Sequence, residues 1–211
     1  MPGQASCDSY SLRGRVSAGH STAIWLTSNA NVSTMTFDSL DLDYSSRCKD
    51  ALELKFSGRI NFFVGYSTKT VPTLASMANK TICDLLHVDG DHTTLGTYTD
   101  FYNFVQGGLV ECGTLFLMDD VCDAHKCHCH TKDHKPYGEC AHPTRALEFM
   151  RLQKLVKVLD RYFKYQINDR GWILGQIACK AGETTVPRWP EPDAKLLLSM
   201  PIRYQNMRKT G

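Results

Sequence analysis

Carboxylates cluster where two apolar stretches of the chain end. The first stretch, residues 82–88, has strand length and stops at Asp89, and the second stops at Asp119 and Asp120. His92 follows three positions after the first of these carboxylates. Carboxylates gathered at one point repel one another and raise a pKa unless a cation is present, and a hard divalent ion such as Mg²⁺ takes oxygen ligands. These residues predict a metal site, with ordinary strand-end and helix-capping carboxylates as the alternative.

The segment between the two clusters has the pattern of a crossover helix. Apolar residues recur there at helical spacing, and Gly107 and Gly108 close it. A strand–helix–strand unit of this length is parallel and right-handed in nearly all cases. Both carboxylate clusters should therefore lie at the carboxyl edge of one sheet, where open α/β sheets bind their ligands.

The same stretch carries a resemblance to a known family. The sequences CDLLHVDGDHTTLGTYTDF (residues 83–101) and GGLVECGTLFLMDD (residues 107–120) resemble class I S-adenosylmethionine-dependent O-methyltransferases. They are most similar to the metal-dependent small-molecule group that includes catechol O-methyltransferase and the macrolide-sugar O-methyltransferases. The resemblance implies a Rossmann-like, doubly wound α/β fold with a mostly parallel seven-stranded sheet and a C-terminal antiparallel hairpin. It also implies a divalent cation such as Mg²⁺ at Asp89, Asp119 and Asp120, with His92 as general base.

The resemblance extends to a cofactor site. The family's first S-adenosylmethionine motif is an acid, then Gly, then three residues, then Gly-x-Ser, and Gly19 and Ser21 match its second half. Arg13 and Arg15 stand where the acid and the first Gly would be, so a cofactor site that is divergent or impaired is the alternative. The cofactor-binding residues that the resemblance implies are Ser17, Gly19, Ser21, Asp38, Ser67 and Asp89.

Two of these positions also have an interpretation from the residues themselves. Asp38 ends an alternating strand, and a carboxylate at that place can accept hydrogen bonds from both ribose hydroxyls. Ser67 follows a third strand, where its hydroxyl could either contact the cofactor or cap the next helix.

A Cys/His-rich insertion, residues 122–142, follows the second carboxylate cluster. Thiolate and imidazole are the ligands that zinc prefers, but the Cys127-His128-Cys129-His130 run lacks the two-to-four-residue gaps of a zinc finger. A structural zinc and an exposed lid loop both stay open. A zinc-binding interaction module is accordingly the alternative function of a different class.

Composition and charge limit the partners. The 211 residues contain 24 Lys and Arg against 22 Asp and Glu, so a net charge of +2 gives no reason to expect nucleic acid. No apolar run is long enough for a membrane span, and the N-terminus lacks the apolar core of a secretory signal. We therefore expect reduced cysteines, a cytoplasmic location, no membrane partner, and unused glycosylation patterns at Asn31 and Asn79.

Patterning divides the chain into three parts. We expect a disordered N-terminus (residues 1–12), one methyltransferase domain (13–180) and a C-terminal tail (181–211) with a short apolar helix near its middle. Inside the domain, a helix is predicted over residues 143–163 and a closing hairpin over 165–178. The predicted reaction transfers a methyl group from S-adenosylmethionine to a hydroxyl of a small molecule, and a homodimer is compatible with this reading.

Overall fold

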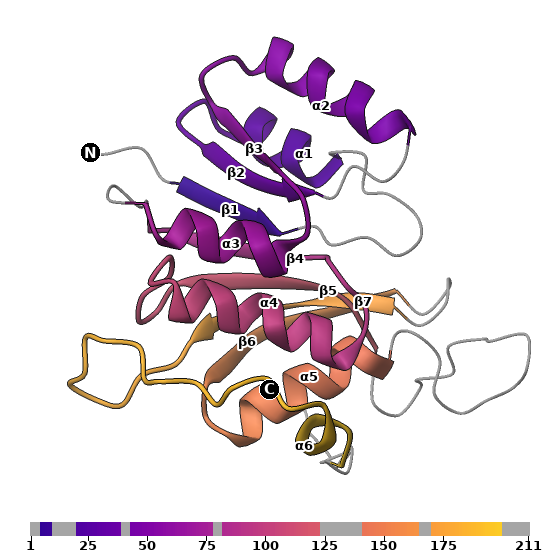
Figure 1. Cartoon of the computed structure of the whole chain (residues 1–211). Helices are drawn as coiled ribbons and strands as arrows, with labels where there is room; N and C mark the ends of the chain where they lie inside the picture. Colours follow the sequence, from indigo (N-terminus) through magenta and orange to yellow (C-terminus); the bar gives the residue numbers. More distant parts are fainter. Residues whose placement is uncertain are drawn as a thin grey trace, which may run out of the picture.

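The computed structural model describes residues 5–9, 20–38, 43–77, 82–122, 141–164 and 170–199. Strands and helices alternate along most of the chain, as expected from the sequence (Figure 1). The strands are β1 (Ala5–Ser9), β2 (Ser33–Asp38), β3 (Ile60–Val64), β4 (Leu85–Val88), β5 (Leu115–Cys122), β6 (Val156–Lys164) and β7 (Arg170–Ile177). The helices are α1 (His20–Ser28), α2 (Asp43–Lys55), α3 (Ser67–Ala75), α4 (Thr94–Gln106), α5 (Ala141–Leu152) and α6 (Ala194–Ser199).

The strands form one sheet in the order β3-β2-β1-β4-β5-β7-β6. The first five strands pair in parallel, whereas β7 runs antiparallel to both β5 and β6. The α/β class, the parallel sheet and the C-terminal antiparallel hairpin are thus confirmed. The first strand of the hairpin, Val156–Lys164, lies before the predicted start at residue 165. Strand order reverses between β1 and β4, and in doubly wound sheets that reversal opens a crevice for ligands at the carboxyl ends of the strands.

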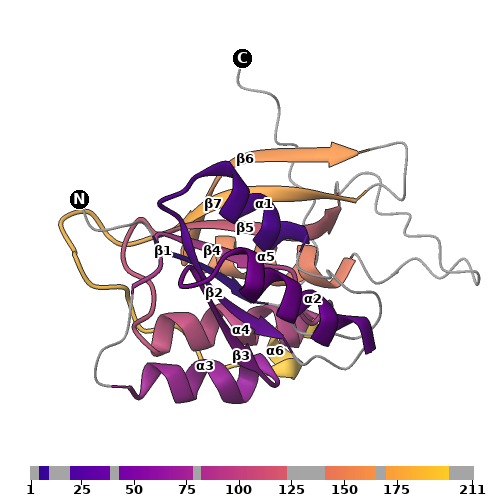
Figure 2. The same ribbon diagram turned by 90° about the horizontal axis from the view of Figure 1, so that it is seen from above.

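Apolar side chains form a core on each face of the sheet. The larger core lies between the sheet and the helices α3, α4, α5 and α6. Figure 2 shows α3, α4 and α6 together on one side of the sheet. A smaller core of Leu26, Leu52, Phe56 and Ile60 joins α1 and α2 on the other side. No helix in the described part of the chain is long and apolar enough to cross a membrane.

The N-terminal residues include a strand that patterning missed. Ala5–Ser9 forms β1, which pairs with β2 on one side and β4 on the other. The expectation that residues 1–12 lack structure is therefore wrong for residues 5–9. The strand ASCDS is polar and short, so its own sequence carries no strand signal, and its two neighbours supply the pairing.

The predicted helix over residues 143–163 is wrong in its second half. Helix α5 ends at Leu152, and Val156–Lys164 forms the edge strand β6. Lys154 ends the helix in the left-handed conformation, with φ of 58°. The amides of Lys154 and Leu155 donate to the carbonyls of Arg151 and Met150, a Schellman ending that usually has Gly where Lys154 stands. Because no Gly marks the end of the helix, the apolar spacing predicts that the helix continues beyond Leu152.

The C-terminal segment packs on the domain. Trp189 is only 1% exposed and stacks near Tyr98 and Phe101, with ring centroids 6.0 and 6.3 Å away. The Tyr98 hydroxyl donates to the Pro190 carbonyl over 2.7 Å. An extended tail over residues 181–211 is therefore wrong for this part, although the short helix predicted near residue 196 is present as α6.

The cysteines differ from expectation. Cys112, in the turn before β5, forms a disulfide with Cys179, just after β7, with their Cα atoms 5.6 Å apart. Cys83 and Cys122 are also disulfide-bonded, and both are buried. The prediction of reduced thiols is wrong at these four positions. For Cys112 and Cys179, the pairing of β5 with β7 brings together two cysteines that are 67 residues apart in sequence.

Candidate functional site

The carboxylate cluster forms at the ends of β4 and β5. Val88 and Met118 pair in register, so Asp89 and Asp119 follow neighbouring positions at one sheet edge. The register of β5 against β7 then shifts between Met118 and Val121, which inserts one extra residue. Such a β-bulge re-aims side chains near functional sites. Within it, Asp120 has a φ of 54°, and its amide donates to Asp119 Oδ1 over 2.8 Å.

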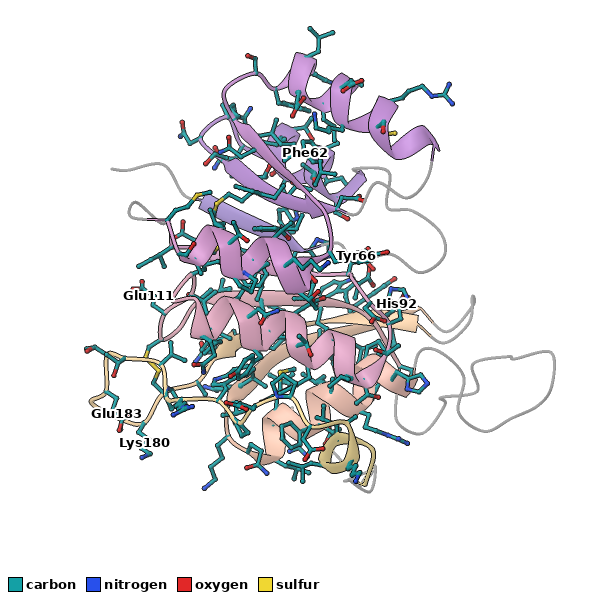
Figure 3. All side chains as sticks on the ribbon, viewed as in Figure 1. Phe62, Tyr66, His92, Glu111, Lys180 and Glu183 are labelled. Carbon is teal, nitrogen blue, oxygen red and sulfur yellow. A yellow bond between two sulfur atoms is a disulfide. The ribbon has the colours of Figure 1, made fainter. Side chains whose placement is uncertain are left out.

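His92 lies between two of these carboxylates. Its Nε2 is 3.5 Å from Asp89 Oδ1, and its Nδ1 is 3.2 Å from Asp120 Oδ2. One ligand atom from each of the three residues lies within 4.8 Å of the others. Figure 3 shows His92 at the end of the sheet where β5 and β7 meet the start of α4. Three side chains of the kinds that can ligate a divalent metal thus converge, two from the loop after β4 and one from β5.

The loop from Asp89 to α4 is held by its own side chains. The Asp91 carboxylate accepts from the Thr93 amide over 2.9 Å, and the Thr93 hydroxyl accepts from the Gly96 amide over 2.9 Å, which caps α4. A Cβ on Gly96 would collide with the Asp91 side chain. These contacts fix the first turn of the helix, and His92 with it.

Asp119 is electrostatically strained in this cluster. Burial raises the pKa of its carboxyl above the ordinary value, and the charges of Asp89 and Asp120 raise this pKa further. A hydrogen bond from the Asp120 amide acts in the opposite direction and lowers it. Asp119 lies beside the group of Asp89, His92 and Asp120 without belonging to it. The predicted metal ligands are Asp89, Asp119 and Asp120. In the group that converges in the structure, His92 stands in place of Asp119. A histidine three residues after a strand-end Asp is a signal for either a base or a ligand, and the sequence alone could not separate the two.

Asp38 lies at the same edge of the sheet. Ser9, the last residue of β1, pairs with Phe37 on one side and with Val88 on the other. Asp38 directly follows Phe37, and Asp89 directly follows Val88, so the two residues lie on either side of the end of β1. Asp38 is 6% exposed, and its carbonyl accepts from the Gly65 amide over 2.8 Å. Asp38 and Asp89 thus lie at the end of the sheet where the strand order reverses.

The remaining predicted cofactor residues have separate positions. Ser21 lies in the first turn of α1 and is partly buried, while Ser17 and Gly19 fall outside the described residues. Ser67 is 1% exposed and donates to Asp100 Oδ1 over 2.5 Å. The cap of α3 is Tyr66, without a side-chain hydrogen bond, so Ser67 does not cap that helix. Its contact with a cofactor stays a prediction.

Comparison with known proteins identifies the family. A family described as a methyltransferase domain matches residues 16–121, half of the chain. The chain belongs to this methyltransferase family. The match ends just after Asp120, so it contains β2 to β4, all but the last residue of β5, and all three residues of the convergent cluster. No curated protein matches the sequence.

Solved structures share the fold of this methyltransferase at low identity. An O-methyltransferase from Bacillus cereus in complex with SAH has a TM-score of 0.61 and 15% identity, covering 82% of this chain and 74% of that one. The O-methyltransferase TomG from Streptomyces achromogenes, in complex with SAM, gives 0.60 and 15%, with 84% and 74% covered. The SAH-bound methyltransferase PaMTH1 from Podospora anserina gives 0.59 and 15%, with 83% and 72% covered.

The predicted zinc region is only partly described. Residues 123–140 fall outside the described residues, and the two ends of the insertion make other contacts. Cys122 is disulfide-bonded and lies 3.2 Å from the Thr144 hydroxyl. His142 Nδ1 is 3.2 Å from the Thr94 hydroxyl. Because a disulfide sulfur is not a thiolate, Cys122 is removed from the zinc ligands that the sequence offered.

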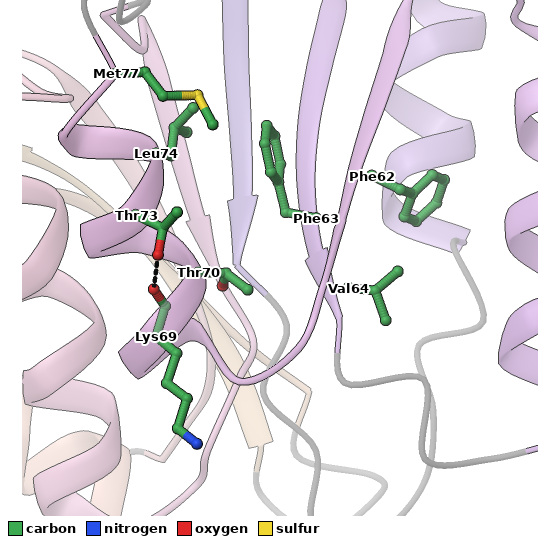
Figure 4. A pocket seen from close by; sticks show the side chains of 8 residues that line it. All are labelled: Phe62, Phe63, Val64, Lys69, Thr70, Thr73, Leu74 and Met77. Atoms are coloured by element: carbon green, nitrogen blue, oxygen red, sulfur yellow. Dashed lines mark hydrogen bonds between the residues drawn. The ribbon is translucent and has the colours of Figure 1, made fainter.

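A hollow of about 300 Å³ lies elsewhere on the methyltransferase (Figure 4). It is lined by Phe62, Phe63, Val64, Lys69, Thr70, Thr73, Leu74 and Met77. These residues belong to the edge strand β3 and to α3 with the turn that follows it. Since β2 and β1 separate β3 from β4, this hollow is distinct from the carboxylate cluster.

Proposed function

We propose that this methyltransferase transfers a methyl group from S-adenosylmethionine to a hydroxyl oxygen of a small molecule, assisted by a divalent cation such as Mg²⁺. The observation that carries the proposal is the convergence of Asp89, His92 and Asp120 within 4.8 Å at the carboxyl edge of the sheet. The solved structures with the same fold include O-methyltransferases in complex with SAH and with SAM.

The residues at this edge fit a cation. Asp89 and Asp120 supply carboxylate oxygens, and Asp119 adds a third carboxyl whose pKa is raised by burial and by its charged neighbours. A positive charge would remove that repulsion. Asp89 and Asp120 would hold the ion, with Asp119 as the next ligand. When bound, the ion would act as a Lewis acid that lowers the pKa of the acceptor hydroxyl.

Cofactor binding is proposed at the reversal of strand order. Asp38 would accept from the ribose hydroxyls, because a nearly buried carboxylate at the end of β2 can accept from both. Asp89 lies across the end of β1 from Asp38. There it would line the binding site of the methyl acceptor, on the side that faces the cofactor. Ser17, Gly19, Ser21 and Ser67 are proposed as further cofactor contacts, as the resemblance implies.

His92 is proposed to take the acceptor proton. With hydrogen on Nδ1, the ring donates to Asp120 Oδ2 over 3.2 Å, which leaves the lone pair of Nε2 facing the Asp89 side. A neutral imidazole in that orientation can accept a proton from a hydroxyl bound beside Asp89. Removing this proton leaves an oxygen nucleophile for in-line attack on the methyl group. Asp120 thus orients the ring and would also ligate the cation.

Two binding partners are proposed for this methyltransferase, a methyl acceptor and a second copy of the chain. The acceptor is a small molecule with a hydroxyl, and a homodimer stays a prediction. The expectation of a cytoplasmic location rests, like that of reduced cysteines, on the lack of an apolar signal core near the N-terminus, and the disulfide between Cys112 and Cys179 argues against it.

Isothermal titration of the purified protein with S-adenosylmethionine, followed by a labelled-methyl assay against a panel of catechols, sugars and phenols, tests this function. We expect saturable cofactor binding and transfer that stops when divalent ions are chelated. Asp89→Asn should lose the transfer, whereas Asp50→Asn, on an exposed residue of α2, should keep it. No binding at millimolar cofactor would instead establish the impaired-site alternative. Stoichiometric zinc in purified protein without cofactor binding would establish the interaction module.

A further inference from the structure

We propose that Asn31 carries an N-linked glycan in a protein that folds in an oxidising, secretory compartment. Asn31-Val32-Ser33 has the acceptor pattern, in which Asn is followed by any residue but Pro and then by Ser or Thr. The pattern alone is weak evidence, because the enzyme that attaches the glycan never meets cytosolic chains. Two structural features strengthen it: the state of the cysteines and the place of the turn that holds Asn31.

The cysteines indicate the compartment. Cys112 and Cys179, 67 residues apart in sequence, form a disulfide, and the buried Cys83 and Cys122 are disulfide-bonded as well. In most organisms disulfides persist in secreted proteins and in the secretory route, while cytosolic thiols are kept reduced. Free cysteine among the described residues is limited to Cys48. One disulfide between distant parts of the chain, together with two buried cysteines that are also disulfide-bonded, is the pattern expected of a secretory protein.

Asn31 is presented where a glycosylating enzyme can reach it. It is exposed in the turn between α1 and β2. Arg59 holds this turn through the backbone, since its guanidinium donates to the carbonyls of Leu26, Asn29 and Val32 over 2.7 to 2.9 Å. The fold of the turn therefore does not depend on the Asn31 side-chain amide, and a sugar attached to it leaves these hydrogen bonds in place.

The glycan would also leave the proposed active site open. Asn31 precedes the first residue of β2, Ser33, whereas Asp38 ends that strand at the site. Five residue steps of an extended strand span roughly 16 Å, so the glycan projects from the opposite edge of the sheet. The disulfide at Cys112 and Cys179 lies at that same opposite edge, beside the start of β5 and the end of β7.

The test uses the full protein, isolated from the cells that make it, with thiols alkylated before denaturation. Digestion with peptide-N-glycosidase in heavy-oxygen water should convert residue 31 to Asp carrying the heavy isotope, and Cys112 and Cys179 should escape alkylation until a reductant is added. An unmodified Asn31, or Cys112 and Cys179 already alkylated, overturns the proposal.

Variants of the same chain separate the site from its neighbours. Asn79 belongs to the second acceptor pattern and lies outside the described residues. The substitution Asn79→Gln removes this second possible glycosylation site. In that background, Ser33→Ala should abolish the glycosidase-sensitive shift on a gel, while Ser33→Thr, which keeps the acceptor pattern, should retain it. A shift that survives Ser33→Ala, or one missing from both Ser33→Thr and the Asn79→Gln parent, contradicts the assignment to Asn31.

Discussion

The imidazole of His92 lies 3.2 Å from the carboxylate of Asp120, although 28 residues separate them in sequence. One comes from the loop after β4 and the other from the bulge in β5. The contact exists because these strands are parallel neighbours and because the extra residue in β5 turns Asp120 toward the loop. It links the proposed proton acceptor to a proposed metal ligand.

Replacing His92 by Ala should reduce methyl transfer by about 10²- to 10⁴-fold, the usual effect of losing a general base. Affinity for S-adenosylmethionine should barely change, because Asp38 and not His92 is proposed to hold the ribose. Turnover and titration calorimetry on the same preparation measure both. The variant Thr93→Ser, beside it, should keep the helix cap and near-full turnover. Full activity of His92→Ala would mean that another residue takes the proton.

Replacing Asp38 by Ala should weaken S-adenosylmethionine binding by about 1–3 kcal/mol, since ribose hydroxyls would lose their acceptor in a nearly buried place. Titration calorimetry measures this directly. Asp50→Ala removes an exposed carboxylate of α2 and should bind the cofactor as the wild type does. Equal affinity in all three proteins would move the ribose site away from the end of β2.

Asp119 should make the metal-free protein less stable as the pH rises. Burial, and then Asp89, raise the pKa of its carboxyl, so the folded state holds the proton more tightly than the unfolded chain does. This contribution to stability is complete below the unfolded pKa, about 3.9, and is lost as the pH rises through the folded pKa. Asp119→Asn should therefore raise the melting temperature of chelated protein at pH 8 and have little effect near pH 4.

Divalent cations provide the matching control for Asp119. Because a bound ion favours the carboxylate, added Mg²⁺ should shrink or reverse the advantage of Asp119→Asn at pH 8. Thermal melts with and without Mg²⁺ measure this. If the variant has the same melting temperature as the wild type at pH 8 without metal, Asp119 is not strained in the way that its surroundings indicate.

Replacing Arg59 by Ala should lower the free energy of unfolding by about 1–3 kcal/mol, because three backbone carbonyls lose a charged donor. Chemical denaturation measures the loss, and Arg47→Ala, on the exposed side of α2, should change it by less than about 0.5 kcal/mol. Methyl transfer by folded Arg59→Ala should persist, since the turn lies at the edge opposite the site. Equal stability of the two variants would show that the turn holds without the guanidinium.

The sequence predicted the part of the fold whose signals are local. Two apolar runs ending in Asp89 and Asp119, with a Gly-closed helix between them, led to the parallel β4–α4–β5 unit. Helix α4 does end in a Schellman motif at Gly108, whose φ is 62°. The same ending at Lys154 has no glycine, so the apolar spacing predicts a helix that continues through the residues of β6.

The features that patterning missed depend on contacts between distant segments. Strand β1 is stabilised by β2 and β4, and the burial of Trp189 depends on α4. The disulfide of Cys112 with Cys179 requires the pairing of β5 with β7, which no local spacing encodes. The carboxylate site was predicted because strand ends place it, whereas the exact ligand set depends on a bulge that one strand's sequence does not reveal.

The most direct test of the central claim is calorimetric titration of metal-depleted protein with Mg²⁺ in the presence of S-adenosylmethionine, which needs no knowledge of the acceptor. The wild type and Asp50→Asn should each bind one ion, and Asp120→Asn should bind it at least about tenfold more weakly, because a carboxylate ligand becomes an amide. Absence of Mg²⁺ binding in the wild type, or equal affinity in the wild type and Asp120→Asn, would contradict a metal-assisted methyltransferase with its ion at Asp89 and Asp120.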